Sequence, residues 1–512
     1  MVILRAQMRI EPSSPSSPNE ADVTPILEWL GSAQGRTGAG DAEQLQRQLL
    51  ALRDTPIPTE QRVKLLDLFF IHVERIVRAE LPELHEVTLP VSRRLRQRVR
   101  ILQELLETAT QDYFNTLAEL FDPEGTRAPR PPQTTLRRII RAISWNIQIS
   151  HLVASPPGLG LWQQLHAAFH TGRRLGLVHA TGERGEPSLQ EIYASVLLAA
   201  IAQPASFRSH ELEFITEYIE ACASLIEFEE TPPADASAIF WIDLEKDFPA
   251  HALVRRIPAP DAKVLYFACD LIAHNTTDRI IALDKNVLPA NLGLPEFAGT
   301  PAGRGVLKRL YGLWGQPAKR KFPRRRQSYR ANLCSGLEQL WHMIKHPANT
   351  EGKNISEWMV TNESPDGYSL MHMSGPTEHL RIGDIVAVQP IGERQEPSAT
   401  WHVCLIRWAL SENPEHIELG LQLLASRAIA AEIARPLELE STTISALILP
   451  ETPPLRKTQS LIVPTGLISE NSGKLIVLVE SDNLEVREIR ATALDEQTTS
   501  IQVFTVEPDE TP

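Results

Sequence analysis

The sequence predicts a multidomain α+β protein, with a helix-rich N-terminal half followed by small antiparallel β-domains. Three observations predict this fold. The chain has 512 residues, which is too long for one ordinary hydrophobic core. Apolar residues recur at three- and four-residue steps through much of the first half, as they do on one face of a helix. Short alternating runs bounded by turn residues follow in the last third, as in strands.

Breaks in these patterns divide the chain into five segments. Residues 1–22 are rich in Ser, Pro and Glu and predict a disordered tail. Residues 23–235 predict a helical domain, and residues 236–318 a mixed α/β connector. Residues 319–436 predict a small β-barrel, and residues 437–512 a second small β-domain.

The helical half contains one especially clear amphipathic pattern. Apolar side chains from Leu95 to Leu120 share one helical face, and the Pro/Gly-rich residues 122–133 end that helix. Ser188 and Glu191 have the spacing of a capping box, in which each side chain bonds a backbone amide at the helix start. This half is therefore expected to pack as helices. Further helices are expected at residues 135–147, 160–170 and 211–228.

The connector is expected to be extended at residues 238–248 and partly helical near residues 264–272 and 303–313. Its role cannot be inferred from its composition.

Charge and apolar content exclude several classes of protein. The net charge of −13 disfavours broad binding to nucleic acid or to anionic membranes. No segment reaches the about 20 apolar residues that a membrane span needs. The sequence therefore predicts a cytoplasmic protein without a membrane span.

Catalytic, cofactor and metal motifs are not recognisable. Four cysteines lie far apart and predict buried thiols rather than a zinc site or disulfides. Four scattered histidines are expected to be surface or capping residues rather than metal ligands: His151, His166, His170 and His179. No HExxH motif, P-loop or arrangement of nucleophile and base is present. The chain is therefore not expected to be an enzyme, and no cofactor is expected.

The strongest local anomaly is the basic segment KRKFPRRRQSYR at residues 319–330, which holds seven basic residues within twelve. A charge run of this kind is usually a solvated linker. Here it directly precedes the strand series. It therefore qualifies as an anion-binding segment in a chain that is acidic overall.

The strand series that follows is typical of a small antiparallel barrel. A hairpin is expected at residues 357–373, because Ser364-Pro365-Asp366-Gly367 has turn chemistry. Further strands are expected at residues 379–389, 400–410 and 416–424, and a short helix at residues 425–434 is expected to close the barrel. Five more strand-like runs follow: residues 442–449, 460–466, 473–480, 485–494 and 500–508.

Two motifs in this segment resemble those of PilZ domains. Arg326 and Arg330 form the RxxxR pattern, and Asn362, Ser364 and Gly367 form the [D/N]xSxxG pattern. The residues 336–346 between the two motifs look helical. Such a helix is either an insertion against the barrel or a replacement for the first strand, and in the second case the two motifs would not meet.

The resemblance implies a receptor for the bacterial second messenger cyclic di-GMP. Its ligand-binding residues would be Arg325, Arg326, Arg330, Asn362, Ser364 and Gly367. Arginine suits this ligand because its planar guanidinium can fork onto a phosphate or a guanine edge and can lie flat on the base. A basic residue at Arg325 tends to accompany an intercalated ligand dimer in this family, so two messenger molecules are expected.

The resemblance also bears on partners and output. Ligand capture is expected to order residues 319–330 and to change how the barrel packs, which implies contact with a protein partner through the helical half. Family members act on motility, attachment, polysaccharide or transcription. The alternative is a nucleic-acid-binding protein that uses the same basic segment, and it predicts steep salt dependence.

Overall fold

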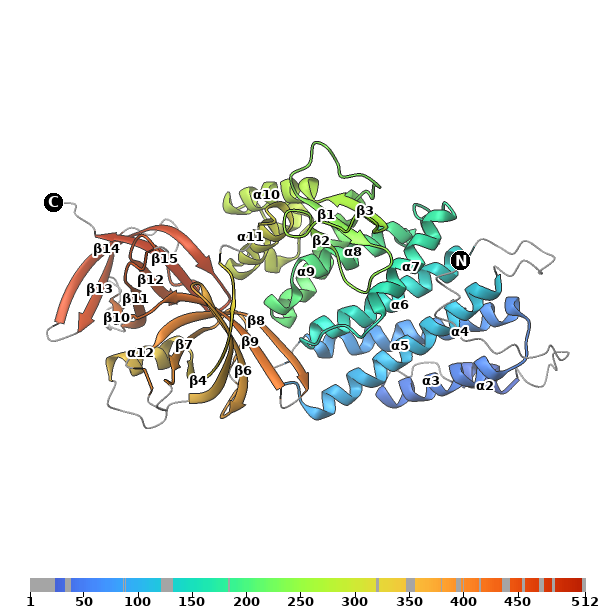
Figure 1. Cartoon of the computed structure of the whole chain (residues 1–512), viewed down its shortest axis with the longest axis horizontal. Coiled ribbons are helices and arrows are strands. Elements are labelled where there is room, and N and C mark those ends of the chain that lie inside the picture. The colour runs from blue at the N-terminus through green and yellow to red at the C-terminus, as the bar shows by residue number, and fades with distance from the viewer. Residues whose placement is uncertain are drawn as a thin grey trace.

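The computed structural model shows an elongated molecule with helices at one end and two β-barrels at the other (Figure 1). The described residues are 24–32, 38–85, 87, 89–120, 132–182, 185–318, 322–346, 355–378, 380–392, 397–398, 400–413, 416–434, 443–453, 456–468, 474–480 and 484–508. The predicted tail at residues 1–22 lies outside this part of the chain, as does the Lys319–Lys321 portion of the basic segment.

The N-terminal domain is helical, as the apolar periodicity predicted. Its helices are α2 Thr24–Ser32, α3 Ala39–Asp54, α4 Thr59–Glu80, α5 Arg93–Leu120, α6 Gln133–Leu152, α7 Leu161–Arg174, α8 Leu189–Ile201 and α9 Ser209–Cys222. Short 3₁₀ turns lie at η2 Leu81–Leu84, η4 Pro204–Ser206 and η5 Ala223–Leu225. The capping box is present at α8, where Ser188 Oγ accepts from the Glu191 amide and Glu191 accepts from the Ser188 amide.

His166 departs from the expectation of a surface or capping histidine. Its side chain is fully buried between α7 and α8. The ring contacts the Tyr193 hydroxyl through Nδ1 at 2.8 Å and the Phe248 carbonyl through Nε2 at 2.9 Å. Burial lowers its pKa to about 4, because a charged imidazolium would lose its hydration there. His166 is therefore a core residue whose two ring nitrogens are both satisfied by the fold.

The connector lies above the junction between helices and barrels (Figure 1). It contains β1 Ile239–Asp243, β2 His251–Ala252, β3 Val264–Ala268, α10 Asp270–Asp284, η6 Pro289–Leu292, η7 Glu296–Gly299 and α11 Pro301–Gly315. The strands form a sheet in the order β2-β1-β3. The partly helical structure expected near residues 264–272 is wrong for residues 264–268. These residues form β3, which pairs with β1 and buries the alternate residues Leu265 and Phe267. One hydrophobic cluster joins the helical domain and the connector, from Ile26 to Trp314.

The first barrel is closed and antiparallel. Its strands are β4 Arg325–Ser335, β5 Ile355–Ser364, β6 Gly367–Ser374, β7 Ile385–Pro390, β8 His402–Asn413 and β9 His416–Ala425. They are ordered β4-β5-β6-β9-β8-β7, and β7 pairs with β4 to close the ring. The interior is filled by apolar side chains around the fully buried Trp358.

The second barrel repeats this connectivity. Its strands are β10 Ile429–Ala434, β11 Ile444–Leu449, β12 Ser460–Pro464, β13 Lys474–Glu480, β14 Leu484–Gln497 and β15 Ile501–Pro508, in the order β10-β11-β12-β15-β14-β13. The helix expected at residues 425–434 is wrong. Residues 429–434 form β10 instead, because they pair with β11 on one side and β13 on the other.

Helix α12 (Leu337–Lys345) is an insertion between β4 and β5, and it packs against the second barrel. Trp341 Nε1 donates to the Ala431 carbonyl at 2.8 Å, and the Lys345 ammonium lies 2.8 Å from the Glu432 carboxylate. β4 runs to Ser335 before α12 begins and pairs with β5 along its length. The inserted helix therefore does not displace the first strand.

The helical domain and both barrels meet at Arg208, just before α9. Its guanidinium donates to the Ile382 carbonyl, the Asp384 carboxylate and the Ser500 hydroxyl, each at 2.7 Å. Burial raises the pKa of Asp384, while its bonds from Ser500 and Arg208 act in the opposite direction. We call Arg208, Asp384 and Ser500 the three-way junction.

All four cysteines are buried free thiols, as predicted. No helix in the described part of the chain is both long enough and apolar enough to cross a membrane.

Candidate ligand-binding site

The β4–β5 pairing brings the two sequence motifs together. Arg326 lies directly opposite Asn362, and Arg325 lies opposite Glu363. Opposed residues in an antiparallel pair have Cβ atoms about 4.5–5.5 Å apart and point to the same face of the sheet. Both arginines are exposed. Arg326 and the polar hairpin can therefore reach one ligand on the barrel surface, whereas Arg325, the first residue of β4, points to the other face of the sheet beside them.

Arg330 lies further along β4, opposite Met359. A bulge between Arg326 and Tyr329 places four steps on β4 against three on β5. Arg330 Nη1 lies 3.1 Å from Glu357 Oε1, with the two side chains 57% and 31% exposed. An ion pair this exposed contributes roughly 0–1 kcal/mol, so Arg330 can leave Glu357 for a more strongly charged ligand.

The turn between β5 and β6 is fixed by short polar contacts. The Ser364 hydroxyl lies 2.5 Å from Asp366 Oδ1 and 3.3 Å from the Gly367 carbonyl. A Cβ atom on Gly367 would overlap the Leu421 carbonyl oxygen of β9, so only glycine allows this approach. All six predicted site residues lie on β4, on β5 or at the β5–β6 turn.

A row of cross-strand neighbours extends this surface beyond the predicted residues. Arg326, Asn362, Ser369, Gly420 and Trp408 are successive partners across β4, β5, β6, β9 and β8. A Cβ atom on Gly420 would overlap the Trp408 indole, so the indole lies across β9 toward Ser369. Trp408 is therefore an aromatic neighbour of the site that the motifs did not indicate.

Two tyrosines support the hairpin from the barrel interior. The Tyr329 hydroxyl donates to Glu363 at 3.1 Å, and the Tyr368 hydroxyl bonds His402 Nδ1 at 2.7 Å. Burial raises the pKa of both phenols and lowers the pKa of His402, so all three stay neutral near pH 7. Hydrogen bonds of these three neutral rings thus support the hairpin beneath the exposed arginines.

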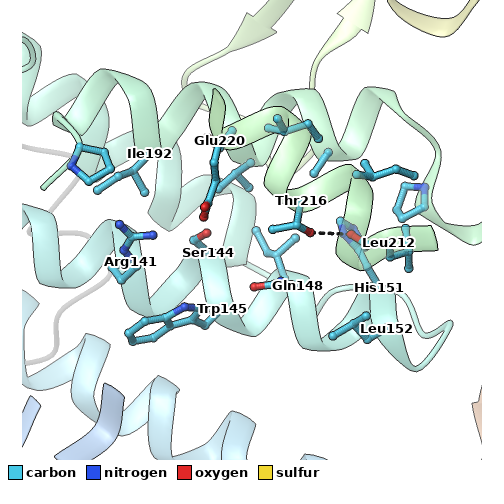
Figure 2. Close-up of a pocket in the computed structure, with 18 of the residues that line it drawn as sticks. Arg141, Ser144, Trp145, Gln148, His151, Leu152, Ile192, Leu212, Thr216 and Glu220 are labelled. Carbon is cyan, nitrogen blue, oxygen red and sulfur yellow. Dashed lines mark hydrogen bonds between the residues drawn. The ribbon is translucent and has the colours of Figure 1, made fainter. Parts of the chain in front are cut away.

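The helical domain contains a separate groove of about 130 Å³ between α6, α8 and α9. Figure 2 shows Arg141 and Glu220 at one end and His151 and Leu212 at the other. Burial lowers the pKa of Arg141, although nearby Glu220 favours its charged form. Among the residues that the structure describes, no three His, Cys, Asp or Glu side chains gather as a metal site.

Comparisons with known proteins agree with this arrangement. A family model described as "Cyclic-di-GMP receptor FimW, N-terminal domain" matches residues 24–234, and one described as "Cyclic-di-GMP receptor FimW, middle PilZ domain" matches residues 342–429. The cyclic-di-GMP receptor FimW of Pseudomonas aeruginosa (strain PAO1) is 20% identical over 550 aligned positions, covering 88% of this chain and 86% of the relative.

A solved structure of the Bacillus subtilis inhibitor of motility (MotI/DgrA) is 12% identical, with a TM-score of 0.12, and covers 36% of this chain and 88% of that one. At that TM-score the likeness supports no conclusion. Both family models describe domains of the same receptor, FimW, and they match this chain with the N-terminal domain before the middle domain. Together they cover more than half of this chain. The chain therefore belongs to the FimW family of cyclic-di-GMP receptors and carries a PilZ domain in its middle.

Proposed function

We propose that this chain binds cyclic di-GMP on the outer surface of β4 and β5 and passes the binding event on to a protein partner. The contact residues would be Arg325, Arg326, Arg330, Asn362, Ser364 and Gly367. The observation that carries the proposal is the direct cross-strand pairing of Arg326 with Asn362. The pairing places a guanidinium beside a short amide, as a ligand with phosphates and guanine edges requires.

Each side chain has a chemical role in this proposal. Arg326 and Arg330 fork onto a phosphate or a guanine O6/N7 edge, and either can stack on a base. Asn362 can both donate to and accept from a guanine edge, and Ser364 offers a hydroxyl beside it. Arg325 contributes a further guanidinium, which fits two stacked messenger molecules better than one. The mechanism is one of binding rather than catalysis.

Binding changes the contacts of Arg330 and of the chain before β4. Arg330 exchanges its exposed pair with Glu357 for the ligand, and residues 322–326 become fixed over the barrel surface. Ala318, just before this segment, accepts a hydrogen bond from Arg255 of the connector at 2.8 Å. A change at the start of β4 is therefore close to the connector, through which it can alter the surface that the helical half offers to a partner.

Calorimetry with cyclic di-GMP tests the proposal. We expect a saturable heat at two ligands per chain, and a loss of about 1–3 kcal/mol of binding free energy for Arg326→Ala or Arg330→Ala. Arg487→Ala in the second barrel is the matched control, because Arg487 is also a partly exposed arginine paired with a glutamate. It should bind like the wild type.

Two results would refute the proposal. Equal binding of GMP and cyclic di-GMP would indicate a general anion surface. A steep salt dependence with preference for polynucleotides would support the nucleic-acid alternative instead.

A further inference from the structure

The start of α5 concentrates positive charge in an acidic protein. Five arginines lie within eight residues in a chain of net charge −13: Arg93, Arg94, Arg96, Arg98 and Arg100. The first turn of α5 holds no acidic residue. A helix N-terminus already carries positive partial charge, so these cations strengthen that potential rather than cancel it. Arg98 is neutralised by Glu80 at 2.5 Å, whereas Arg100 has only an exposed i,i+4 pair with Glu104.

A cavity of about 330 Å³ opens beside these arginines, between α5, α6 and the loop that follows α6. The polar residues that line it are Arg96, Arg100, Gln103, Glu107, Asn146 and Ser155. Arg96 is anchored by its own contacts, with Nε donating to the Val91 carbonyl at 3.0 Å and Nη2 to the Ser411 hydroxyl at 2.5 Å. The cavity therefore has at its rim one guanidinium anchored to the fold, that of Arg96, and one largely exposed guanidinium, that of Arg100.

Asn146, in the wall of this cavity, has an unused hydrogen-bond donor. The residue is 2% exposed, and its buried Nδ2 has no partner among the described residues. A buried amide donor without an acceptor costs free energy, because it has lost its hydrogen bonds to water. A group that supplied an acceptor there would recover that free energy.

The neighbouring bonds fix which way the Asn146 amide faces. The Ser150 hydroxyl donates to the Asn146 carbonyl at 3.0 Å, so it must accept from Gln103 Nε2 at 2.9 Å. Gln103 Nε2 then also donates to Asn146 Oδ1 at 3.2 Å. If the Asn146 side-chain amide were rotated by 180°, its Nδ2 would face Gln103 Nε2, and two hydrogen-bond donors would oppose each other. Its Nδ2 therefore remains the unpaired end.

We propose that this cavity binds a small phosphate-bearing molecule. Arg96 and Arg100 supply positive charge, and Asn146 supplies a neutral donor, which together match the acceptor oxygens of a phosphate. The exposed carboxylate of Glu107 lies in the same lining, and it favours a ligand with hydroxyl or amino donors beside its phosphate. The site lies in the helical domain and is independent of the proposed cyclic di-GMP site.

The position of this cavity gives its occupant a route to the first barrel. Ser411, at the tip of the β8–β9 hairpin, also donates its amide to the Ala154 carbonyl at 2.8 Å and accepts from the Ser155 hydroxyl at 2.9 Å. Two lining residues, Arg96 and Ser155, thus hold the same hairpin residue. An occupant that drew either one inward would loosen the docked hairpin.

Titration of the full chain with inorganic pyrophosphate and with ADP, followed by calorimetry, tests this proposal. All titrations use a protein that carries Arg326→Ala, because this change removes the main guanidinium of the proposed barrel site. The further substitutions are made in that protein. We expect saturable binding of both probes, with ADP tighter if Glu107 contacts the nucleoside. Arg100→Gln should weaken both by about tenfold, as loss of one charge-assisted bond implies. Asn146→Leu should also weaken both.

Arg78→Gln is the matched control, because Arg78 forms the same kind of exposed i,i+4 pair, with Glu74 at 2.6 Å, on another helix. It should leave probe binding unchanged. The proposal is overturned if neither probe binds, or if Arg100→Gln and Asn146→Leu bind as tightly as Arg78→Gln does. Circular dichroism of each variant shows whether a loss of binding reflects unfolding, and Arg100→Gln keeps the test valid if Asn146→Leu does not fold.

Discussion

At the residue scale, the geometry of the proposed ligand surface depends on two glycines as well as on its arginines. Gly367 lets β9 approach the turn that carries Ser364, and Gly420 leaves room for the Trp408 indole across β9. This effect does not depend on contact with a ligand, although Gly367 is also one of the proposed contact residues. Gly367 sets how closely two backbones can approach, and Gly420 sets how closely a ring can approach a backbone. Both therefore help to set the spacing of the polar groups on this surface.

The buried ring of His166 makes stability depend on pH. Its folded pKa of about 4 lies below the unfolded value of about 6.5, so the unfolded chain binds more protons between these values. The free energy of unfolding should therefore fall as the pH drops through this window and recover as it rises. At pH 5 this one residue should cost about 2 kcal/mol relative to pH 7.

Urea unfolding of the wild type and of His166→Gln at pH 7 and pH 5 measures this contribution. The wild type should lose more stability than the variant between the two pH values, because glutamine does not titrate. Other groups with shifted pKa values, such as Asp112, are present in both proteins and cancel in the difference. Equal losses in the two proteins would contradict the assignment.

At the element scale, α12 holds the two barrels together. Trp341 is 8% exposed, hydrogen-bonded to Ala431 and covered by the Lys345 ammonium at 4.5 Å from its ring centre. Its side chain belongs to the hydrophobic cluster shared by both barrels. The helix therefore acts as packing between two closed sheets rather than as part of either one.

Removing the Trp341 side chain should destabilise the second barrel selectively. Trp341→Ala should cost about 3–5 kcal/mol, since it leaves a cavity and an unpaired carbonyl at Ala431. Hydrogen exchange at the amides of β10 should accelerate, while exchange in β5 stays near the wild-type rate. Glu338→Gln is the control, because it changes an exposed side chain on the same helix. Unchanged exchange in β10 would show that α12 is not needed for this contact.

The elements that the sequence predicted well are those whose own pattern decides their structure. The face from Leu95 to Leu120 gave α5 because its apolar period matches a helix over seven turns. β10 could not be predicted in this way. Its sequence IAAEIA is rich in helix-favouring alanine, and it forms a strand only because β11 and β13 flank it.

Residues in and around the proposed binding site also differ in whether the sequence could predict them. The six predicted contact residues follow from the resemblance of their motifs to those of PilZ domains. Trp408 could not be predicted in this way, because its place in the row depends on bulges in β4, β5 and β8 that shift the register between strands. The burial of His166 could not be predicted either, since nothing near it in sequence indicates that the Phe248 carbonyl contacts its ring.

At the scale of the whole molecule, Arg208 links three domains through one guanidinium. Its side chain is 13% exposed and that of Asp384 is 16% exposed, so the pair is largely removed from solvent. Breaking a buried pair by removing one partner costs about 3–5 kcal/mol, because the remaining charge is left uncompensated. The domain arrangement should therefore be sensitive to this single residue.

Arg208→Met should increase the radius of gyration measured by small-angle X-ray scattering, since the barrels lose their main polar contact with α9. The double variant Arg208→Met/Asp384→Asn should recover part of the lost stability, because it removes the stranded carboxylate as well. A single variant that scatters like the wild type and melts at the same temperature would show that apolar packing alone fixes the domains.

Only residues 426–428 separate the last strand of the first barrel from the first strand of the second. A fully extended link of that length spans roughly 10 Å, so the two barrels cannot separate widely. If a bound molecule tilts the first barrel near β4, we expect the second barrel to move with it. The displacement should then be largest at the end of the second barrel that lies farthest from the link.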